Sequence, residues 1–264
     1  MLAKLKNEFL RYLSKVINQK SHRVKIFDSY RMIDVGKRLY IFSNHKIIRG
    51  PFKDVTIPPC ISDETNSYRA SWILGLFEQQ LHAFLESRHW NLVVNLGGAE
   101  GYYPICMLKK NLCETAIVFE SLESGREAIR RFSKENGVEN RIEIHGHADR
   151  NFLSHLPHQL PEGANRLIVD IEGGEFDLFH PEVIDALSAF HILLEVHDFA
   201  TETKEEVEEL LDLLSNNYMI QILDENTRTF PNRNQVPCLS REDVFLVGAE
   251  GRSYDMFWVL ASPK

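Results

Sequence analysis

The chain has 264 residues, of which 44% are hydrophobic and 26% are charged, so it can form one large domain with a substantial core and lacks the composition of a disordered protein. The four cysteines show neither a C-x-x-C pair nor metal-finger spacing, and we expect a thiol-reducing, cytoplasmic location. There is no continuous apolar segment at the amino terminus and no apolar run of about 18 residues, so the sequence predicts neither a signal peptide nor a membrane span.

The net charge of −8 hides an asymmetry along the chain. Residues 1–50 hold 12 Lys and Arg against 3 Asp and Glu, whereas the remainder holds 18 against 35. Residues 1–20 predict an amphipathic helix with a basic face. This helix could lie on an anionic membrane surface, or it could dock on the acidic part of this chain or on a second subunit of a homo-oligomer. The acidic remainder argues against nucleic acid as a partner.

Short strand-like runs come next in the chain. They occupy Val24–Phe27, Arg38–Phe42 and Lys46–Ile48. The turn residues Ser43-Asn44-His45 predict that the last two runs form a β-hairpin. We therefore expect residues 1–66 to form an appendage, made of the N-terminal helix and a small hairpin cap.

Beyond residue 66, strand and helix patterns alternate. A helix is predicted over residues 67–87, where His82 is expected to pack rather than react. We expect strands at 92–96, 116–119, 141–145, 166–170, 190–196, 218–223 and 256–261, and helices at 102–110, 124–136, 175–187 and 203–216. Whether Val244–Val247 adds a strand stays open. The alternation predicts an α/β fold over residues 67–264, with a doubly wound, seven-stranded, mostly parallel sheet.

A glycine-rich turn follows the first predicted strand of this sheet. Its glycines are Gly97, Gly98 and Gly101. Glycine lets the backbone turn sharply and lets a ligand approach, and the next helix would aim free N–H groups at that ligand. Glu120, at the end of the next strand, could accept hydrogen bonds from both ribose hydroxyls of a nucleoside cofactor. The dinucleotide fingerprint is not met, because Ala99 and Tyr102 stand at its second and third glycine positions.

Two further strands end in polar residues, in the segments Arg166–Glu175 and His191–His197. Together with the glycine turn and Glu120, they resemble the FkbM-like family of S-adenosylmethionine-dependent methyltransferases. The most specific match is Asp170-Ile-Glu172-Gly173-Gly174-Glu175, which is close to the family's D-x-E-G-x-E signature. The segment from Tyr254 to Val259 is similar to the family's final strand. The resemblance covers roughly residues 67 to 262.

The resemblance implies a seven-stranded sheet with one antiparallel strand and S-adenosylmethionine bound over the first strand's turn. It also implies methyl transfer to an oxygen, such as the hydroxyl of a sugar or another small metabolite. Carried over by position, the methionine part of the cofactor would lie against Asn95, Gly97, Gly98 and Gly101, the ribose against Glu120, and the adenine against His147 and Ala148.

Asn95 departs from the family pattern, which has an acidic residue there. The amide keeps an acceptor oxygen but lacks the charge that favours a cationic sulfonium ligand. A second hypothesis therefore stays open, in which the chain is a non-catalytic, methyltransferase-like binding subunit. A third, a nicotinamide-dependent oxidoreductase, is disfavoured by Tyr102.

The chemistry of methyl transfer is assigned to polar residues at the strand ends. Residues two apart on a strand share a side, which predicts that Asp170 pairs with Glu172 and Glu195 with His197, provided each strand extends that far. We expect His197 to act as the general base, with Asp170 and Glu172 orienting acceptor or cofactor. Two alternatives remain: a divalent metal held by these carboxylates and His197, or a purely structural role as loop and helix caps.

Overall fold

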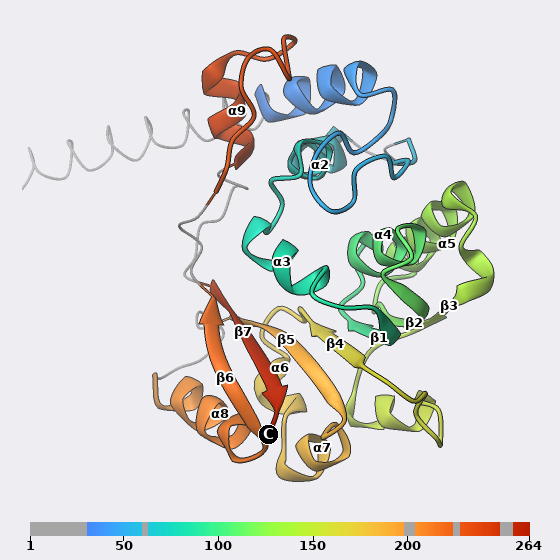
Figure 1. Cartoon of the computed structure of the whole chain (residues 1–264), viewed down its shortest axis with the longest axis vertical. Coiled ribbons are helices and arrows are strands. Elements are labelled where there is room, and N and C mark those ends of the chain that lie inside the picture. The colour runs from blue at the N-terminus through green and yellow to red at the C-terminus, as the bar shows by residue number, and fades with distance from the viewer. Residues whose placement is uncertain (1–30, 60–62, 198–203, 224–227, 249–255) are drawn as a thin grey trace, which may run out of the picture.

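The computed structural model describes residues 31–59, 63–197, 204–223, 228–248 and 256–264. Seven strands form one sheet in the order β3-β2-β1-β4-β5-β7-β6 (Figure 1). They are β1 (Trp90–Leu96), β2 (Cys113–Phe119), β3 (Ile142–His145), β4 (Asn165–Val169), β5 (Phe190–His197), β6 (Tyr218–Leu223) and β7 (Met256–Pro263). Strand β7 is antiparallel to both of its neighbours, and the pairs from β3 to β5 are parallel. The predicted seven-stranded sheet with one antiparallel strand is confirmed.

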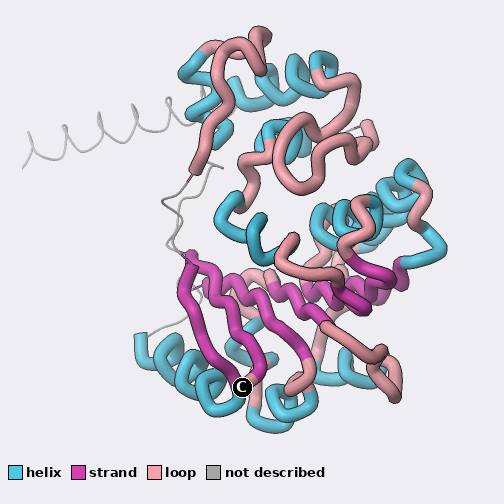
Figure 2. The backbone as a smooth tube through the Cα atoms, in the orientation of Figure 1, coloured by secondary structure: helices cyan, strands magenta, loops and turns pink. Residues whose placement is uncertain are grey.

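Helices cover both faces of the sheet (Figure 2). In the view of Figure 1, α4 (Tyr102–Lys109) and α5 (Glu123–Asn136) lie above it, and α6 (Glu175–Leu178), α7 (Pro181–Ala186) and α8 (Lys204–Asn217) lie below it. Side chains alternate between two cores: Val93 joins the upper one, whereas Leu92 and Val94 join the lower one. The strands therefore read as continuous apolar runs, because both of their faces are buried.

The predicted helix over residues 175–187 is divided into α6 and α7. Phe179 and His180 between them have extended backbone. The cause is Pro181, which is well suited to the first position of α7 but keeps the preceding residue out of helical conformation.

The predicted β-hairpin cap is wrong, because residues 31–42 are helical and Lys46 only forms an isolated bridge with Thr56. Val35 and Leu39, one helical turn apart, are fully buried. The strand-like pattern at residues 38–42 is therefore the end of a helix, which stops before the left-handed turn at residues 44 and 45. The predicted N-terminal helix and the run Val24–Phe27 lie outside the described residues.

The predicted helix over residues 67–87 is also interrupted. Helix α2 (Asp63–Leu74) stops before a turn at Gly75, and η1 (Gln79–Leu81) and α3 (His82–Leu85) follow the turn. Gly75 has a φ of +59°, and a Cβ there would lie 2.4 Å from the carbonyl oxygen of Arg49. A glycine is needed at this position because the chain turns against another segment of backbone.

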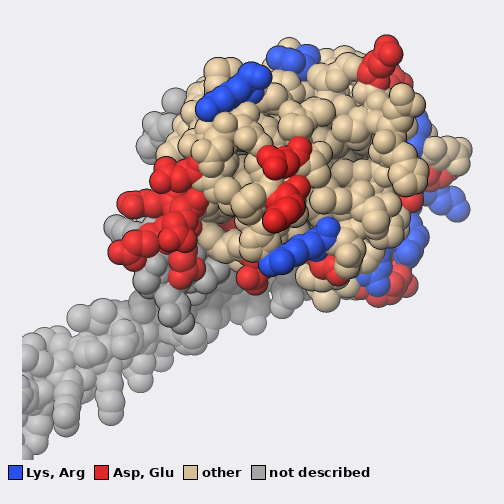
Figure 3. Space-filling model, turned by 90° about the horizontal axis from the view of Figure 1, so that it is seen from below, with Lys and Arg blue, Asp and Glu red and all other residues tan. Residues whose placement is uncertain are grey.

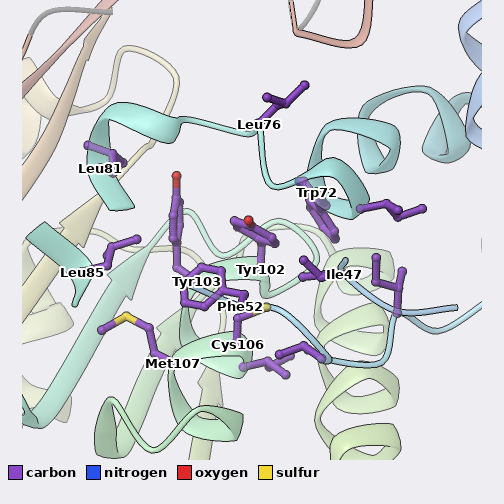
Figure 4. Close-up of a cluster of buried hydrophobic side chains, with 14 of the residues drawn as sticks. Ile47, Phe52, Trp72, Leu76, Leu81, Leu85, Tyr102, Tyr103, Cys106 and Met107 are labelled. Carbon is purple, nitrogen blue, oxygen red and sulfur yellow. The ribbon is translucent and has the colours of Figure 1, made fainter. Parts of the chain in front are cut away.

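A helical layer lies above the sheet and packs on α4. It contains the helix over residues 31–42, α2 and α9 (Arg241–Gly248), so Val244–Val247 is helical and not an eighth strand (Figure 1). Figure 4 shows the aromatic cluster that joins this layer to the sheet domain. Tyr102 of α4 stacks on Trp72 of α2 at 4.7 Å between ring centroids and meets Phe52 edge-on at 5.3 Å. The predicted boundary at residue 66 falls inside α2.

The lower surface is unevenly charged. Seen from below, acidic side chains gather towards one side (Figure 3). Among the exposed acidic residues of α8 are Glu205, Glu208 and Glu209, as expected for the solvated face of an amphipathic helix. No described helix is both long enough and apolar enough to cross a membrane.

Candidate active site

A pocket of about 650 Å³ opens at the carboxyl ends of the parallel strands. It is lined by residues 97 and 99 after β1, 119–122 at the end of β2 and 147–150 after β3, and by residues 170–172, 174, 177 and 178 after β4. The carboxyl edge of a parallel sheet is where the βα loops converge and ligands bind. The volume lies within the usual range for a small-molecule site.

The glycine turn forms one wall of this pocket. Gly97 has a φ of +80°, and a Cβ at this position would lie 1.6 Å from the carbonyl oxygen of Asp170. The backbone N–H groups of Gly97 and Gly98 both donate to the carbonyl oxygen of Phe119, at 3.0 and 2.9 Å. The turn is thus clamped between β2 and β4, and only glycine fits at Gly97.

Glu120 supports the same turn from the end of β2. Its Oε2 accepts a hydrogen bond from the Ala99 N–H at 2.8 Å, and its Oε1 accepts one from the Leu122 N–H at 2.7 Å. Glu120 is buried yet contributes to the pocket wall. The carboxylate therefore holds two loops together and still presents acceptor positions to a ligand, since two oxygens offer about four lone-pair sites.

The residues predicted to bind the cofactor fall into two groups. Gly97, Glu120, His147 and Ala148 line the pocket. The remaining three do not, namely Asn95, Gly98 and Gly101. Gly98 packs against the Val118 side chain, where a Cβ would lie 2.3 Å from its Cγ1, and Gly101 precedes α4 with a φ of +87°. Both shape the turn from behind the pocket wall.

Asn95 lies beneath the turn and is 2% exposed. Its Nδ2 lies 3.4 Å from the carbonyl oxygens of both Leu96 and Ile168, which places a donor between β1 and β4. An ionised carboxylate has no proton to donate there. The amide therefore fits a structural position between the two strands.

A cluster of polar side chains stands beside the pocket, centred on the ring of His197. The ring Nε2 lies 3.5 Å from Asp170 Oδ1, 3.6 Å from Glu195 Oε2 and 3.8 Å from Glu172 Oε2. On the other side of the ring, Nδ1 lies 3.1 Å from Glu175 Oε1. The structure thus brings together the three residues predicted to be catalytic. Asp170 and Glu172 line the pocket, but His197 does not and is 1% exposed.

The alternation of side chains along a strand, from which this convergence was predicted, holds for Glu195 and His197 only. Glu195 and His197 lie on β5 and point to the same side, as strand alternation requires. Strand β4 ends at Val169, so the condition for the pairing is not met and Asp170 and Glu172 do not pair along a strand. Glu172 instead has a φ of +53° in the loop after β4, and this turn leaves its carboxylate 3.8 Å from the imidazole ring.

The cluster perturbs the proton affinity of its members. Burial, followed by the charge of Glu195, raises the pKa of Asp170 well above its usual value. Burial of the His197 ring acts to lower its pKa, but the hydrogen bond and charge of Glu175, with the charges of Glu195 and Asp170, outweigh burial and raise the pKa overall. Negative charge is therefore in excess around the ring.

Glu175 is the main residue of the site that received no role from the sequence. It is fully buried, and its Oε1 also accepts a hydrogen bond from the His197 backbone N–H at 2.7 Å. The signal was present, because Glu175 is the last residue of the D-x-E-G-x-E signature. The pocket residues Ser121, Leu122, Asp149, Arg150 and Asp177 carried no such signal, because they lie in loops or on a short helix without a sequence pattern.

No protein-family model matches this chain, and no curated protein matches it. Among solved structures, it is similar to the O-methyltransferase TomG from Streptomyces achromogenes, in complex with SAM (13% identity, TM-score 0.46, covering 88% of this chain and 90% of that one). It is also similar to an O-methyltransferase from Bacillus cereus, in complex with SAH (13%, 0.44, 71% and 80%). A third similar structure is a precorrin-6Y C5,15-methyltransferase from Geobacter metallireducens (14%, 0.45, 73% and 88%). The fold assignment rests on the sheet order described above.

Proposed function

We propose that this protein is an S-adenosylmethionine-dependent methyltransferase that transfers a methyl group to an oxygen of a small molecule. The observation that carries the proposal is the order of groups along the pocket wall. The Gly97 turn, Glu120 and the pair His147-Ala148 follow three adjacent strands, β1, β2 and β3. This order suits a methionine chain, a ribose and an adenine laid across the strand ends.

The polar cluster lies at the methionine end of such a ligand. Leu96 and Val169 are partners in the register of β1 and β4, so Gly97 and Asp170, the next residues, are neighbours across the two strands. The Asp170 N–H also donates to the carbonyl oxygen of Leu96 at 3.0 Å. A methyl group presented over the Gly97 turn would therefore face Asp170 and its surroundings.

The reaction needs an acceptor oxygen in line with the sulfur–methyl bond. As the new oxygen–carbon bond forms, the carbon–sulfur bond breaks and its electron pair stays on sulfur, which leaves a neutral thioether. The hydroxyl proton must leave as well. In this proposal Asp170 and Glu172 contact the acceptor or the cofactor, and His197 receives the proton through Asp170, which touches both the ring and the pocket.

The raised pKa of His197 has two effects on this role. It strengthens the ring as a proton acceptor, but it also increases the fraction that is already protonated at neutral pH. The assignment of His197 as the base remains a prediction. The burial of its ring and its raised pKa favour proton transfer through Asp170 over direct contact between the ring and the acceptor.

The acceptor class follows from the charge of the pocket wall. Five acidic residues line the pocket against Arg150, namely Glu120, Asp149, Asp170, Glu172 and Asp177. An anionic acceptor would be repelled, so we expect a neutral, hydroxyl-bearing molecule such as a sugar or another small metabolite. The cytoplasmic location, expected from the spacing of the four cysteines, belongs to the same proposal.

The non-catalytic binding subunit is the second candidate. It rests on Asn95, which stands where the FkbM-like family that the sequence resembles has an acidic residue. Because Asn95 does not line the pocket, this substitution removes no group from the described wall. Within the part of the chain that the structure describes, no observation favours the second candidate over the first.

Calorimetric titration of the full chain with S-adenosylmethionine, S-adenosylhomocysteine and NAD tests the proposal. We expect the first two to bind and NAD not to bind. Binding of NAD alone would refute the proposal. Screening hydroxyl-bearing acceptors for conversion of the cofactor to S-adenosylhomocysteine then separates the two candidates, because turnover of any acceptor excludes a purely non-catalytic subunit.

A further inference from the structure

We propose that Asp170, Glu172 and His197 form a binding site for one divalent metal ion. Each residue offers one ligand atom, and these atoms all lie within 4.8 Å of one another. From His197 Nε2, the distances to Asp170 Oδ1 and Glu172 Oε2 are 3.5 and 3.8 Å. These distances exceed the ~2.9 Å of a good hydrogen bond. They suit two ligands of a common ion, since bonds of about 2.1 Å place neighbouring ligand atoms roughly 3 to 4 Å apart.

The orientation of the His197 ring supports a metal at Nε2. Glu175 is fully buried, and its two oxygens are held by the backbone N–H groups of His197 at 2.7 Å and Gly173 at 3.0 Å. Its Oε1 also faces Nδ1 of the ring at 3.1 Å. A carboxylate can only accept, so Nδ1 carries the hydrogen. The lone pair of a neutral ring is then on Nε2, which lies within 3.8 Å of oxygens of Asp170, Glu172 and Glu195.

Metal-binding histidines have this same arrangement. They usually donate the distal ring N–H to a carboxylate or carbonyl, which fixes the tautomer and increases the basicity of the nitrogen that binds the ion. Glu175 occupies that supporting position here, and Nε2 faces the pocket side of the cluster.

The charge around the cluster supports the same assignment. Asp170 Oδ1 is inaccessible to solvent and accepts no hydrogen bond, although a buried carboxylate oxygen normally has a partner. Among the described residues, no Lys or Arg forms an ion pair with Asp170, Glu172 or Glu175. Glu195 Oε2, 3.6 Å from the same ring nitrogen, adds further negative charge. A divalent cation would neutralise this excess and give Asp170 Oδ1 a partner.

The ligand set indicates the kind of ion. Carboxylate oxygens with a single imidazole suit a hard cation such as Mn²⁺ or Mg²⁺, whereas zinc sites are usually richer in histidine and cysteine. The Glu172 side chain is 78% exposed, and both carboxylate ligands line the pocket. The ion would thus keep positions open towards the pocket, where it could bind and polarise an acceptor oxygen. That catalytic role rests on the proposed function and replaces His197 as the base, because a metal-bound Nε2 has no lone pair left for a proton. Metal binding itself does not depend on the proposed function.

Binding of Mn²⁺ to the full chain tests the site directly. The protein is freed of metal with EDTA, desalted and titrated with Mn²⁺ in the absence of cofactor, with free Mn²⁺ followed by electron paramagnetic resonance. We expect about one Mn²⁺ per chain, displaced by excess Mg²⁺. Asp170→Asn and His197→Gln should each weaken binding more than tenfold. Glu175→Gln should weaken it about 10- to 100-fold through the orientation of the ring.

Glu182→Gln is the matched control, because it removes one negative charge from an exposed residue of α7 away from the cluster. It should bind Mn²⁺ like the wild type. Circular dichroism and thermal unfolding confirm that each variant is folded. The proposal is overturned if the wild type does not bind Mn²⁺ at millimolar concentration, if it binds only Zn²⁺, or if folded Asp170→Asn and His197→Gln both keep wild-type affinity.

A separate titration of the same samples with S-adenosylhomocysteine distinguishes the two proposals. Binding of S-adenosylhomocysteine without Mn²⁺ binding refutes the metal site and leaves the proposed function in place. Binding of Mn²⁺ without binding of S-adenosylhomocysteine supports the metal site and refutes the proposed function.

Discussion

Replacing Glu120 perturbs the protein in two measurable ways. Its carboxylate accepts hydrogen bonds from the N–H groups of Ala99 and Leu122, and it also lines the pocket where a ribose is proposed to lie. Both bonds are only partly buried, so water can partly replace the lost acceptor. We take about 1 to 2 kcal/mol for each bond, near the low end for hydrogen bonds to a charged group.

Glu120→Ala should therefore lower the free energy of unfolding by about 2 to 4 kcal/mol, a large part of the stability of an ordinary domain. Glu120→Gln keeps one acceptor oxygen and should lose about half as much. Both variants lack the charge that would face the ribose hydroxyls. This loss should weaken S-adenosylhomocysteine binding by about 1.5 to 3 kcal/mol, or roughly ten- to a hundredfold.

Chemical denaturation gives the first quantity, and calorimetric titration below the unfolding transition gives the second. Glu120→Gln is the decisive variant, because it remains folded enough to compare affinities. If it unfolds at the wild-type midpoint, the hydrogen bonds to the turn do not stabilise the fold. If it binds S-adenosylhomocysteine like the wild type, Glu120 does not contact the ribose.

Three further predictions concern single residues. Gly97→Ala should abolish cofactor binding and destabilise the fold, because its Cβ would collide with the Asp170 carbonyl. The control Gly137→Ala, with a φ of +66° and open space around the new Cβ, should lower the free energy of unfolding by only about 1 kcal/mol. Similar unfolding midpoints for the two variants would contradict this prediction. Burial lowers the pKa of His82 to about 4 from 6.5, so its protonation favours the unfolded chain. About 3 kcal/mol of stability, present above pH 6.5, should be lost as the pH falls towards 4, and denaturation of His82→Gln should show a flatter pH profile. Once an acceptor is known, His197→Ala should lose turnover while it still binds S-adenosylmethionine. Inhibition of the wild type by EDTA would then support the metal role of His197, no effect of EDTA would support its role as the base, and wild-type rates in the variant would refute both.

The strands of the sheet were predictable because burial on both faces leaves uninterrupted apolar runs between polar turns. The run at 218–223 became β6 with its predicted bounds. The error at residues 38–42 has the opposite cause. Arg38–Phe42 mixes polar and β-favouring residues in a run too short to show a period, and Val35 and Leu39 make it helical through contacts with a distant core. Tertiary packing decided a segment that local pattern could not.

The candidate site was predictable in its members but not in its geometry. Glycines and acids at strand ends indicated Gly97, Glu120 and Asp170, because a parallel sheet collects its carboxyl ends at one edge. The sequence could not show that Asn95 lies beneath the turn, since a residue's place on a strand does not reveal which partner its side chain finds. Nor could it show that Glu172 reaches the ring through a left-handed loop residue. Both depend on backbone details that have no local sequence pattern.

The position of β7 in the sheet affects the order in which the fold can be assembled. β7 lies between β5 and β6, although it follows both in the chain. Until synthesis has reached Pro263, β6 has no partner and the main-chain groups along one edge of β5 are unpaired. A nascent chain would therefore expose two apolar strand edges, which are sites for mispairing with other chains. Chaperone contact during synthesis would be most valuable in the interval between the completion of α8 and the arrival of β7.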